Sequence, residues 1–495
     1  MATIDIVNLT FGYEGSYDSV FENVSFKIDT DWKLGFTGRN GRGKTTFLNL
    51  LLGKYNYSGN IISPVEFEYF PFEVKDELQN TIDVISEIIF IPDYEYWRLQ
   101  RELSLLDVDE NVLYRPFNTL SKGEQIKILL ASLFLKEHCF LLIDEPTNHL
   151  DMKTRKIVSD YLKSKKGFIL VSHDRKFLDN CIDHILSINK TSIVIQKGNF
   201  SSWHKNKQRQ DYFELAKNEK LKRDIKRLEK SARQKADWSD KVEATKKGTK
   251  ISGLRPDTGF IGHKAAKMMK RSKSIESKQQ SSIEEKSKLL KDIETADKLK
   301  ITHLKHYSSN ILSFNGVSLY YGDKKICDNL NLEINQGDRI AICGKNGCGK
   351  STILKFILGS PDLISIGNFQ KVSNLKISYV SQDTAGLKGN LSDFATEKNI
   401  DESLFKAILR KLDFSRVQFE KDISDCSEGQ KKKILIAKSL CEKAHLYLWD
   451  EPLNFIDILS RIQIEELILK SKPTILFVEH DKTFVESVAT KIIKL

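Results

Sequence analysis

The feature that most constrains this chain is a glycine-rich pattern that occurs twice. The pattern GxxxxGK[ST] runs from Gly38 to Thr45 and again from Gly344 to Ser351. Each copy follows a short apolar stretch typical of a buried strand and precedes a stretch with helical periodicity. In that context the backbone N–H groups of the loop can surround phosphate oxygens. The sequence therefore predicts two phosphate-binding loops in α/β domains.

Further landmarks follow both loops at matching distances. Lys44 is followed after 77 residues by Ser121, in LSKGEQ, and Lys350 is followed after 77 residues by Ser427, in CSEGQ. Each serine is followed after 24 residues by the glutamate of an Asp-Glu pair that ends an apolar stretch. A His-Asp pair comes 28 or 29 residues later. Matching spacing of four landmarks means that one domain occurs twice.

The two Asp-Glu pairs predict a division of labour. Asp144 and Asp450 should end a buried strand beside the Mg²⁺ position and hold the metal. Glu145 and Glu451 come next, and each can act as the general base that polarises the attacking water. A capping or ion-paired acid is the alternative. The position between an apolar strand and a proline argues against it.

Together these motifs resemble those of ATP-binding cassette (ABC) ATPases, and both halves match. The resemblance implies that His173 and His480 are switch histidines that sense the γ-phosphate, although a lone histidine at a strand end is usually structural. It also implies that Tyr13 and Tyr321 stack on adenine, with a core aromatic as the alternative. Gln382 resembles the Q-loop metal ligand.

ABC cassettes close head-to-tail, so the signature of one cassette would complete the phosphate-binding loop of the other. The cofactors implied are ATP and Mg²⁺. The residues expected to bind ATP are Tyr13, Gly38, Asn40, Gly41, Gly43, Lys44, Thr45, Thr46, Ser121, Gly123, Tyr321, Gly344, Asn346, Gly347, Gly349, Lys350, Ser351, Thr352, Ser427 and Gly429. The residues expected to hold the metal are Thr45, Asp144, Ser351, Gln382 and Asp450.

The two sites depart unequally from the family pattern. The first cassette reads EYFPF over 68–72 where the second has the Q-loop Gln382, and a phenyl ring cannot ligate Mg²⁺. The second signature has Cys426 and Glu428 where the family usually has Leu and Gly. Both departures fall on the site built around Lys44. We expect that site to be the slower or more switch-like one, but not inactive.

The basic charge of the chain lies between the cassettes. The net charge is +11, whereas residues 205–300 hold 28 Lys/Arg and 15 Asp/Glu, a net of +13. Apolar residues at helical spacing on both sides of a glycine-rich stretch predict a long antiparallel α-helical hairpin. A solvated charged hairpin is the alternative, but a one-signed charge that peaks at the tip suits a phosphate-rich partner.

Two cassettes with a long basic linker resemble the ABC-F proteins, which act on ribosomes. The segments GRNGRGK (38–44), WDEPLN (449–454) and MKRSK (269–273) resemble the Lsa-type antibiotic-resistance branch. That resemblance implies binding at the tRNA exit site, contact with large-subunit rRNA and P-site tRNA, and displacement of lincosamides, pleuromutilins or streptogramin A by the linker tip. A housekeeping ABC-F translation factor shares every catalytic residue and remains an alternative. The paired ATPase subunit of an importer fits poorly, because it needs no such linker.

The expected domains are an ABC ATPase domain over 1–203, a helical linker over 204–303 with its tip near 248–262, and a second ABC ATPase domain over 304–495. Leu254, Arg255 and Phe260 are expected nearest the drug site, although they could instead pack the loop or touch rRNA only. The residues expected at the tip or on the ribosome are Lys246, Lys247, Lys250, Leu254, Arg255, Phe260, Lys264, Lys267, Lys270, Arg271 and Lys273.

Composition restricts where the chain acts. No apolar run approaches the roughly 18–20 residues that span a bilayer, and the N-terminus does not have the pattern of a signal peptide. Seven scattered cysteines without a CxxC pair argue against a disulfide framework or a zinc cluster. We expect a cytoplasmic monomer with intramolecular cassette pairing and no transmembrane subunit.

Overall fold

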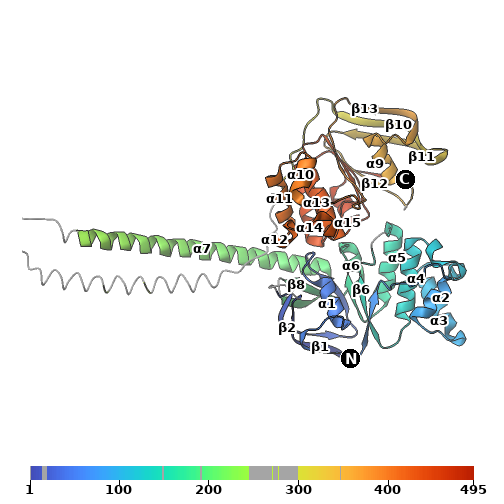
Figure 1. The fold of residues 1–495 in the computed structure, drawn as a ribbon, viewed down its shortest axis with the longest axis horizontal. Coiled ribbons are helices and arrows are strands. Elements are labelled where there is room, and N and C mark those ends of the chain that lie inside the picture. Colours follow the sequence, from blue (N-terminus) through green and yellow to red (C-terminus); the bar gives the residue numbers. More distant parts are fainter. Residues whose placement is uncertain are drawn as a thin grey trace, which may run out of the picture. The chain divides into compact units, whose positions relative to one another are not determined.

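The computed structural model describes residues 2–13, 19–147, 150–189, 192–244, 270, 277, 299–345 and 347–495. It divides into two compact units. One unit comprises Met1–Trp203 and Ala296–Leu495, and the other comprises His204–Thr295. The first unit contains two cassettes with the same α/β architecture, so the predicted duplication of an α/β domain is confirmed (Figure 1).

The first cassette contains two sheets. The antiparallel sheet has the order β2-β1-β4, with β1 Thr3–Phe11, β2 Phe21–Asp29 and β4 Ser58–Ile62. The larger sheet has the order β5-β6-β7-β3-β8-β9 and is parallel except for its last pair. Its strands are β3 Lys33–Thr37, β5 Glu66–Phe70, β6 Cys139–Asp144, β7 Phe168–Val171, β8 His184–Asn189 and β9 Ser192–Lys197.

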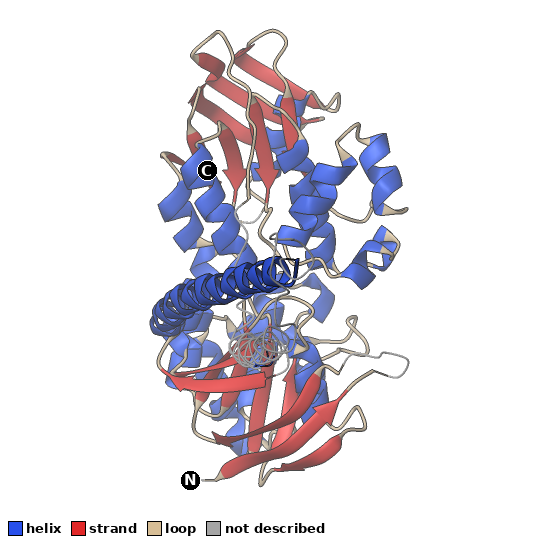
Figure 2. Ribbon diagram, turned by 90° about the vertical axis from the view of Figure 1, so that its left-hand side faces the viewer, coloured by secondary structure: helices blue, strands red, loops and turns tan. Residues whose placement is uncertain are grey.

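Helices connect the parallel strands of the first cassette, as a parallel sheet requires. They are α1 Lys44–Leu51, α2 Thr81–Ile88, α3 Tyr96–Leu105, α4 Lys122–Phe134, α5 Met152–Ser164 and α6 Arg175–Cys181, with short 3₁₀ turns at Asp93–Glu95, Glu110–Tyr114 and Phe117–Thr119. Figure 2 shows helices beside the strands in both cassettes.

The second cassette repeats the plan. Its antiparallel sheet has the order β11-β10-β13, with β10 Asn310–Tyr321, β11 Lys324–Asn335 and β13 Leu363–Lys371. Its parallel sheet has the order β14-β15-β16-β12-β17, with β12 Arg339–Cys343, β14 Ile377–Val380, β15 Leu446–Asp450, β16 Ile475–Val478 and β17 Lys491–Lys494. The helices are α9 Lys350–Leu358, α10 Leu391–Glu397, α11 Glu402–Lys411, α12 Arg416–Phe419, α13 Glu428–Cys441, α14 Ile458–Ser471 and α15 Lys482–Val488, with a 3₁₀ turn at Ile423–Asp425.

Each parallel sheet lies between two hydrophobic cores. In the first cassette, Ile143 and Leu170 belong to the core shared with the helices, whereas Leu142 and Ile169 belong to the core shared with the antiparallel sheet. Successive side chains of a strand point to opposite faces, so a strand buried on both faces reads as a continuous apolar run. The sequence FILV of β7, buried at all four positions, is such a run.

The segment between the cassettes begins with one long helix. Helix α7 spans Phe200–Ala244, and its first turn buries Phe200 and Trp203 in the first cassette. The predicted return helix and the tip are not tested by the described residues. Lys270 is described as helical and exposed. The other expected tip residues, Lys246, Lys247, Lys250, Leu254, Arg255, Phe260, Lys264, Lys267, Arg271 and Lys273, lie outside the described residues.

Among the helices of the described ranges, none is both long enough and apolar enough to cross a membrane.

Candidate functional site

Each glycine-rich loop ends on a glycine that a larger residue could not replace. Gly43 and Gly349 have φ angles of 90° and 96° and immediately precede α1 and α9. A Cβ atom on Gly43 would lie 2.5 Å from the side chain of Val20, and one on Gly349 would lie 2.7 Å from that of Ile326. Both the positive φ and the lack of space therefore require glycine. The helix that follows directs its free N–H groups into the loop.

The two loop lysines bend back over their loops in the same way. The Lys44 ammonium donates to the carbonyls of Gly38 at 2.9 Å and Arg39 at 3.2 Å. The Lys350 ammonium donates to the carbonyls of Gly344 at 3.0 Å and Lys345 at 2.8 Å. Burial lowers the pKa of Lys44, against the raising effect of Asp457 and Glu145. Each loop thus carries a charged donor pointing into its cradle.

Asp144 and Asp450 end the equivalent parallel strands β6 and β15, and polar groups gather at the carboxyl ends of strands in α/β sheets. The Thr45 hydroxyl lies 3.2 Å from Oδ2 of Asp144, and the Ser351 hydroxyl bonds Asp450. Burial raises the pKa of Asp450 to about 6. Its Oδ1 is buried and, within the described part of the chain, has no hydrogen-bond partner. Oxygen atoms are the ligands that Mg²⁺ prefers, so the hydroxyl and carboxylate oxygens of each site fit that ion.

Both predicted general bases occupy a strained backbone conformation. Glu145 has a φ of 51° and Glu451 a φ of 46°, a region that non-glycine residues seldom adopt. The neighbouring strands hold these peptides in place, because the Glu145 N–H donates to Val171 at 2.9 Å and the Glu451 N–H to Val478 at 3.0 Å. Such strain is typical of functional positions.

Glu145 is largely buried, near the charges of Asp144, Arg461 and Lys44. His173 Nε2 is 3.2 Å from Glu145 Oε1. Both carboxylate oxygens are buried, and neither has a hydrogen bond of good geometry from a residue that the structure describes. Burial, followed by the charge of Asp144, raises the pKa of Glu145 to about 8. Burial also lowers the pKa of His173 well below its ordinary value, so this histidine is neutral.

Glu451 has a more polar environment. The Gln382 amide donates to its Oε2 at 3.1 Å, the Asn454 amide donates to the same oxygen at 2.6 Å, and His480 Nε2 lies 3.4 Å from Oε1. Burial alone would raise the pKa of this carboxyl, but the hydrogen bond and charge of His480, together with Lys432, bring it below its ordinary value. The Q-loop glutamine therefore contacts the predicted base of its site rather than its aspartate.

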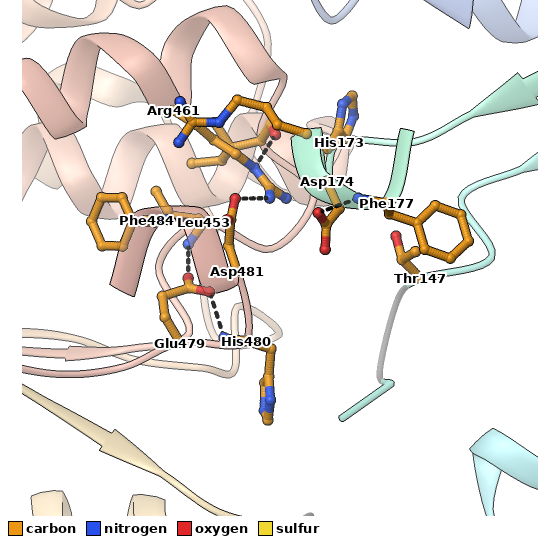
Figure 3. Close-up of polar contacts among 12 residues, drawn as sticks. Thr147, His173, Asp174, Phe177, Leu453, Arg461, Glu479, His480, Asp481 and Phe484 are labelled. Atoms are coloured by element: carbon orange, nitrogen blue, oxygen red, sulfur yellow. Dashed lines mark hydrogen bonds and ion pairs between the residues drawn. The ribbon is translucent and has the colours of Figure 1, made fainter. Parts of the chain in front are cut away.

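The segment after each switch histidine is fixed by an arginine-aspartate pair, and Figure 3 shows the pair of the second cassette, Arg461 and Asp481. Asp481 accepts from the Phe484 N–H to cap α15 and lies 3.2 Å from the Arg461 guanidinium. Asp174 accepts from the Phe177 N–H to cap α6 and lies 3.1 Å from Arg155. Neither arginine was predicted from the sequence, although each follows the glutamate of its Asp-Glu pair by ten residues. That repeated spacing could have identified them.

The residue before each switch histidine differs between the cassettes. In the second, the buried Glu479 accepts from the Leu453 N–H at 2.8 Å and from the His480 N–H at 2.9 Å (Figure 3). In the first, Ser172 occupies this position, and its hydroxyl lies 3.1 Å from that of Thr147. The first cassette thus joins the same two segments through neutral hydroxyls.

The signature serines begin their helices with matching caps. The Ser121 side chain accepts from the Glu124 N–H while the Glu124 carboxylate accepts from the Ser121 N–H, and Ser427 makes the same reciprocal pair with Gln430. Such a capping box satisfies two of the free N–H groups at the helix start. Helices α4 and α13 therefore begin at fixed positions, with Gly123 and Gly429 in their first turns.

The first loop touches the second signature. The Asn40 amide donates to the Phe455 carbonyl at 2.8 Å, and a Cβ on Gly429 would lie 2.8 Å from that amide. At the second site, built around Lys350, there is a cavity of about 280 Å³. Its lining includes Lys350, Ser351, Thr352, Gln382, Glu451, His480 and, from the first cassette, Arg155. Asn346, the counterpart of Asn40, lies outside the described residues.

Two polar clusters near the site built around Lys44, which we call the first site, were not predicted. Lys433 Nζ lies 2.8 Å from Asp457 Oδ2, and both side chains are almost fully buried. The guanidinium groups of Arg39 and Arg42 lie 3.4 and 3.6 Å from Asp413 Oδ1. Charge periodicity alone cannot identify such pairs, because their partners come from distant segments.

The remaining predicted residues occupy less constrained positions. Tyr13 is 46% exposed, with its hydroxyl 2.6 Å from that of Thr46, and Tyr321 is 57% exposed at the end of β10. An exposed ring is available for stacking in each case. Gly41 and Gly347 have φ angles of 80° and 79°, consistent with tight turns in both loops.

The ABC transporter family model matches residues 21–148 and again 327–454, together more than half of the chain. The chain belongs to this family. It therefore binds nucleotide and is an ABC-type ATP hydrolase. Both matches include a phosphate-binding loop, a signature and an Asp-Glu pair.

Known proteins resemble the chain over nearly its whole length. "Ribosome protection protein VmlR" of Bacillus subtilis (strain 168) is 29% identical over 97% of this chain and 85% of that protein. "ATP-binding protein Uup" of Buchnera aphidicola subsp. Acyrthosiphon pisum (strain APS) is 27% identical over 99% of this chain and 80% of that protein. A chain in the crystal structure of the archaeal ribosomal stalk protein aP1 with the ribosome recycling factor aABCE1 has a TM-score of 0.62 and 18% identity, covering 98% of this chain and 87% of that one. At that identity the likeness concerns the fold alone.

Proposed function

We propose that this protein is a ribosome-associated ATPase of the ABC-F type that protects the peptidyl-transferase region from large-subunit antibiotics. The observation that carries the proposal is the combination of two paired ATP sites with a segment between them, residues 205–300, of net charge +13, most of whose first half belongs to the 45-residue helix α7. The 29% identity to a protein named for ribosome protection supports it. A basic lever suits ribosomal RNA, whose phosphates attract Lys and Arg.

ATP binding would hold the cassettes together and keep the linker in the tRNA exit site, and hydrolysis would release the protein. Glu145 and Glu451 are the proposed general bases, and His173 and His480 lie within 3.2–3.4 Å of them to sense the γ-phosphate. Lys44 and Lys350 would bind phosphate oxygens. The signature residues Ser427 and Gly429 would close the first site, and Ser121 and Gly123 the second.

Mg²⁺ would be held in the first site by Thr45 and Asp144, and in the second by Ser351 and Asp450. The ion would neutralise negative charge on the ATP phosphates. Gln382 stays a predicted ligand through its amide oxygen, and its amide nitrogen donates to Glu451 at 3.1 Å and would orient that base. The adenine would stack on Tyr13 or Tyr321, whose rings are partly exposed.

We propose that the two sites hydrolyse ATP unequally, with the first the slower. Glu145 has a raised pKa and lies among few donors, whereas Glu451 has a lowered pKa and accepts from Gln382 and Asn454. Measuring ATP turnover of Glu145→Gln and Glu451→Gln tests this. Glu451→Gln should lose the larger share of the wild-type ATP turnover. Equal losses of turnover in the two variants would contradict unequal hydrolysis at the two sites.

The resistance role and the housekeeping role separate in a susceptible bacterial host. Expression of the chain should raise the inhibitory concentration of a lincosamide, a pleuromutilin or streptogramin A, and Glu145→Gln/Glu451→Gln expressed at the same level should not. Unchanged inhibitory concentrations across all three classes would favour a housekeeping translation factor. Either role places the protein in the cytoplasm, as a monomer with intramolecular cassette pairing and without a transmembrane subunit.

A further inference from the structure

The two cassettes place a tyrosine at the same register of their edge strands, but only one of them reaches the adjacent aspartate. In the first cassette β5 pairs with β6 so that Tyr69 lies opposite Leu142. In the second, β14 pairs with β15 so that Tyr379 lies opposite Leu448. Each partner residue is two positions before the strand-end aspartate, Asp144 or Asp450.

The same register shows what replaces the Q-loop glutamine. Phe70 lies opposite Ile143 and Val380 opposite Trp449, so Phe72 and Gln382 are equivalent positions. Phe72 packs against the hydrophobic core that the sheet shares with the helices. It therefore presents no polar group to the first site, in agreement with the sequence. A polar group reaches that site from a neighbouring position instead.

The Tyr69 hydroxyl donates to Oδ2 of Asp144 at 3.1 Å. The Thr45 hydroxyl lies 3.2 Å from the same oxygen. A tyrosine hydroxyl is protonated at neutral pH and a carboxylate only accepts, so Tyr69 is the donor of this hydrogen bond. The Lys54 ammonium lies 5.5 Å from the centre of the Tyr69 ring and packs over its face.

Among the described residues, the second site keeps the counterpart of the Thr45 contact but not that of the tyrosine contact. Asp450 is bonded by Ser351, and in the part of the chain that the structure describes Tyr379 makes no hydrogen bond to it. The Gln382 amide of that cassette donates to Glu451. The two sites thus use equivalent strands and loops differently: the first supports its aspartate, and the second supports its glutamate.

We propose that Tyr69 is a positioning residue of the first site, which orients the Asp144 carboxylate toward Mg²⁺ where the Q-loop provides no polar side chain. This inference rests on the proposed role of Asp144 as a metal ligand. Donors that hydrogen-bond a ligating carboxylate fix its orientation, and their loss typically weakens metal affinity about tenfold or more. Tyr69→Phe removes only the hydroxyl and leaves the ring that packs under Lys54.

The test isolates each site by removing the loop lysine of the other. In Lys350→Ala, the Mg²⁺ concentration that gives half-maximal binding of a fluorescent ATP analogue to the first site is measured with and without Tyr69→Phe. The expected result is an increase of about tenfold. Binding of the analogue in EDTA should not change, because Tyr69 acts through the metal ligand and not on the nucleotide. A weaker affinity in EDTA to the same extent would assign the tyrosine a merely structural role and overturn the proposal.

The matched control is Tyr379→Phe in Lys44→Ala, measured in the same way at the second site. Its Mg²⁺ requirement should change less than twofold. An unchanged Mg²⁺ requirement in Tyr69→Phe would refute the role of Tyr69 alone. Binding to Lys350→Ala that is indifferent to Mg²⁺ from the start would instead refute the proposed metal role of Asp144.

Discussion

At the scale of single residues, the same side chain acquires two different chemistries in this molecule. Glu145 and Glu451 follow equivalent strands and share a positive φ, yet the pKa of Glu145 is raised to about 8 and that of Glu451 is lowered. At Glu145 the effect of burial on the pKa dominates, whereas at Glu451 hydrogen bonds and nearby cations lower the pKa by more than burial raises it. The protonation of the base therefore distinguishes the sites near neutral pH.

This difference predicts unequal pH profiles. A general base must be ionised, and a carboxyl of pKa about 8 is roughly one-tenth ionised at pH 7 and nine-tenths at pH 9. ATP turnover of Glu451→Gln, which leaves the first site, should rise about tenfold over that interval. Turnover of Glu145→Gln, which leaves the second site, should change less than about twofold, because Glu451 is already ionised. Profiles of the same shape would contradict the difference in environment.

At the scale of elements, the strands and the helix starts can be predicted from local sequence, whereas the residue pairs that link one element to another cannot. The apolar run of β7 and the capping residues Ser121 and Ser427 can be read directly, because period, burial and caps are local properties. The Tyr69–Asp144 hydrogen bond joins residues 75 positions apart. Its partner depends on strand register, so the sequence located Phe72 in the Q-loop position but not the tyrosine that faces the site.

The buried Lys433–Asp457 pair joins the signature helix α13 to the start of α14 and gives an element-scale prediction. Removing one partner of a buried pair typically costs about 3–5 kcal/mol, since the other charge is left unpaired. Lys433→Ala should therefore lower the free energy of unfolding by about 3 kcal/mol in urea titrations. The equivalent Lys127, which donates to the Asp107 carbonyl at 3.2 Å, provides the control. Lys127→Ala should lower the free energy of unfolding by about 1 kcal/mol, because only one hydrogen bond is lost.

The stabilisation by this pair should also depend on pH. Burial alone would raise the pKa of Asp457, but the charge and hydrogen bond of Lys433 bring it well below its ordinary value. A depressed pKa means that the stabilisation is fully present above the unfolded value of about 4 and is lost as the pH falls below it. The difference between wild type and Lys433→Ala should hence shrink below about pH 4. Equal costs for Lys433→Ala and Lys127→Ala at neutral pH would contradict the pair's role.

At the scale of the whole molecule, the charge is separated from the catalytic parts. Residues 205–300 carry a net +13 while the chain carries +11, so the remainder sums to −2. Composition along the chain located this basic segment and predicted a helix within it, which the structure describes as α7. Sequence could not establish the partner, because a basic helix fits any polyanion. The relative named for ribosome protection narrows that choice in our proposal.

Neutralising lysines at the expected tip should weaken binding to the ribosome more than neutralising lysines in the middle of α7. In Lys246→Gln/Lys247→Gln/Lys250→Gln we expect lower affinity for purified ribosomes and a shallower salt dependence, because fewer counterions are released when the linker neutralises fewer phosphates. The matched control is Lys217→Gln/Lys220→Gln/Lys222→Gln, in exposed positions of α7. Equal losses of affinity in both triple variants would indicate general charge attraction and contradict a specific role for the tip.

Co-sedimentation of the nucleotide-locked protein with ribosomes tests most directly whether ATP controls ribosome binding. Glu145→Gln/Glu451→Gln should retain ATP binding without hydrolysis and pellet with ribosomes in the presence of ATP. Lys44→Ala/Lys350→Ala, which has lost both phosphate-binding ammonium groups, should remain in the supernatant. Recovery of the locked variant as free protein, at the level of the lysine variant, would contradict the account of this protein as an ATP-controlled ribosome-binding factor.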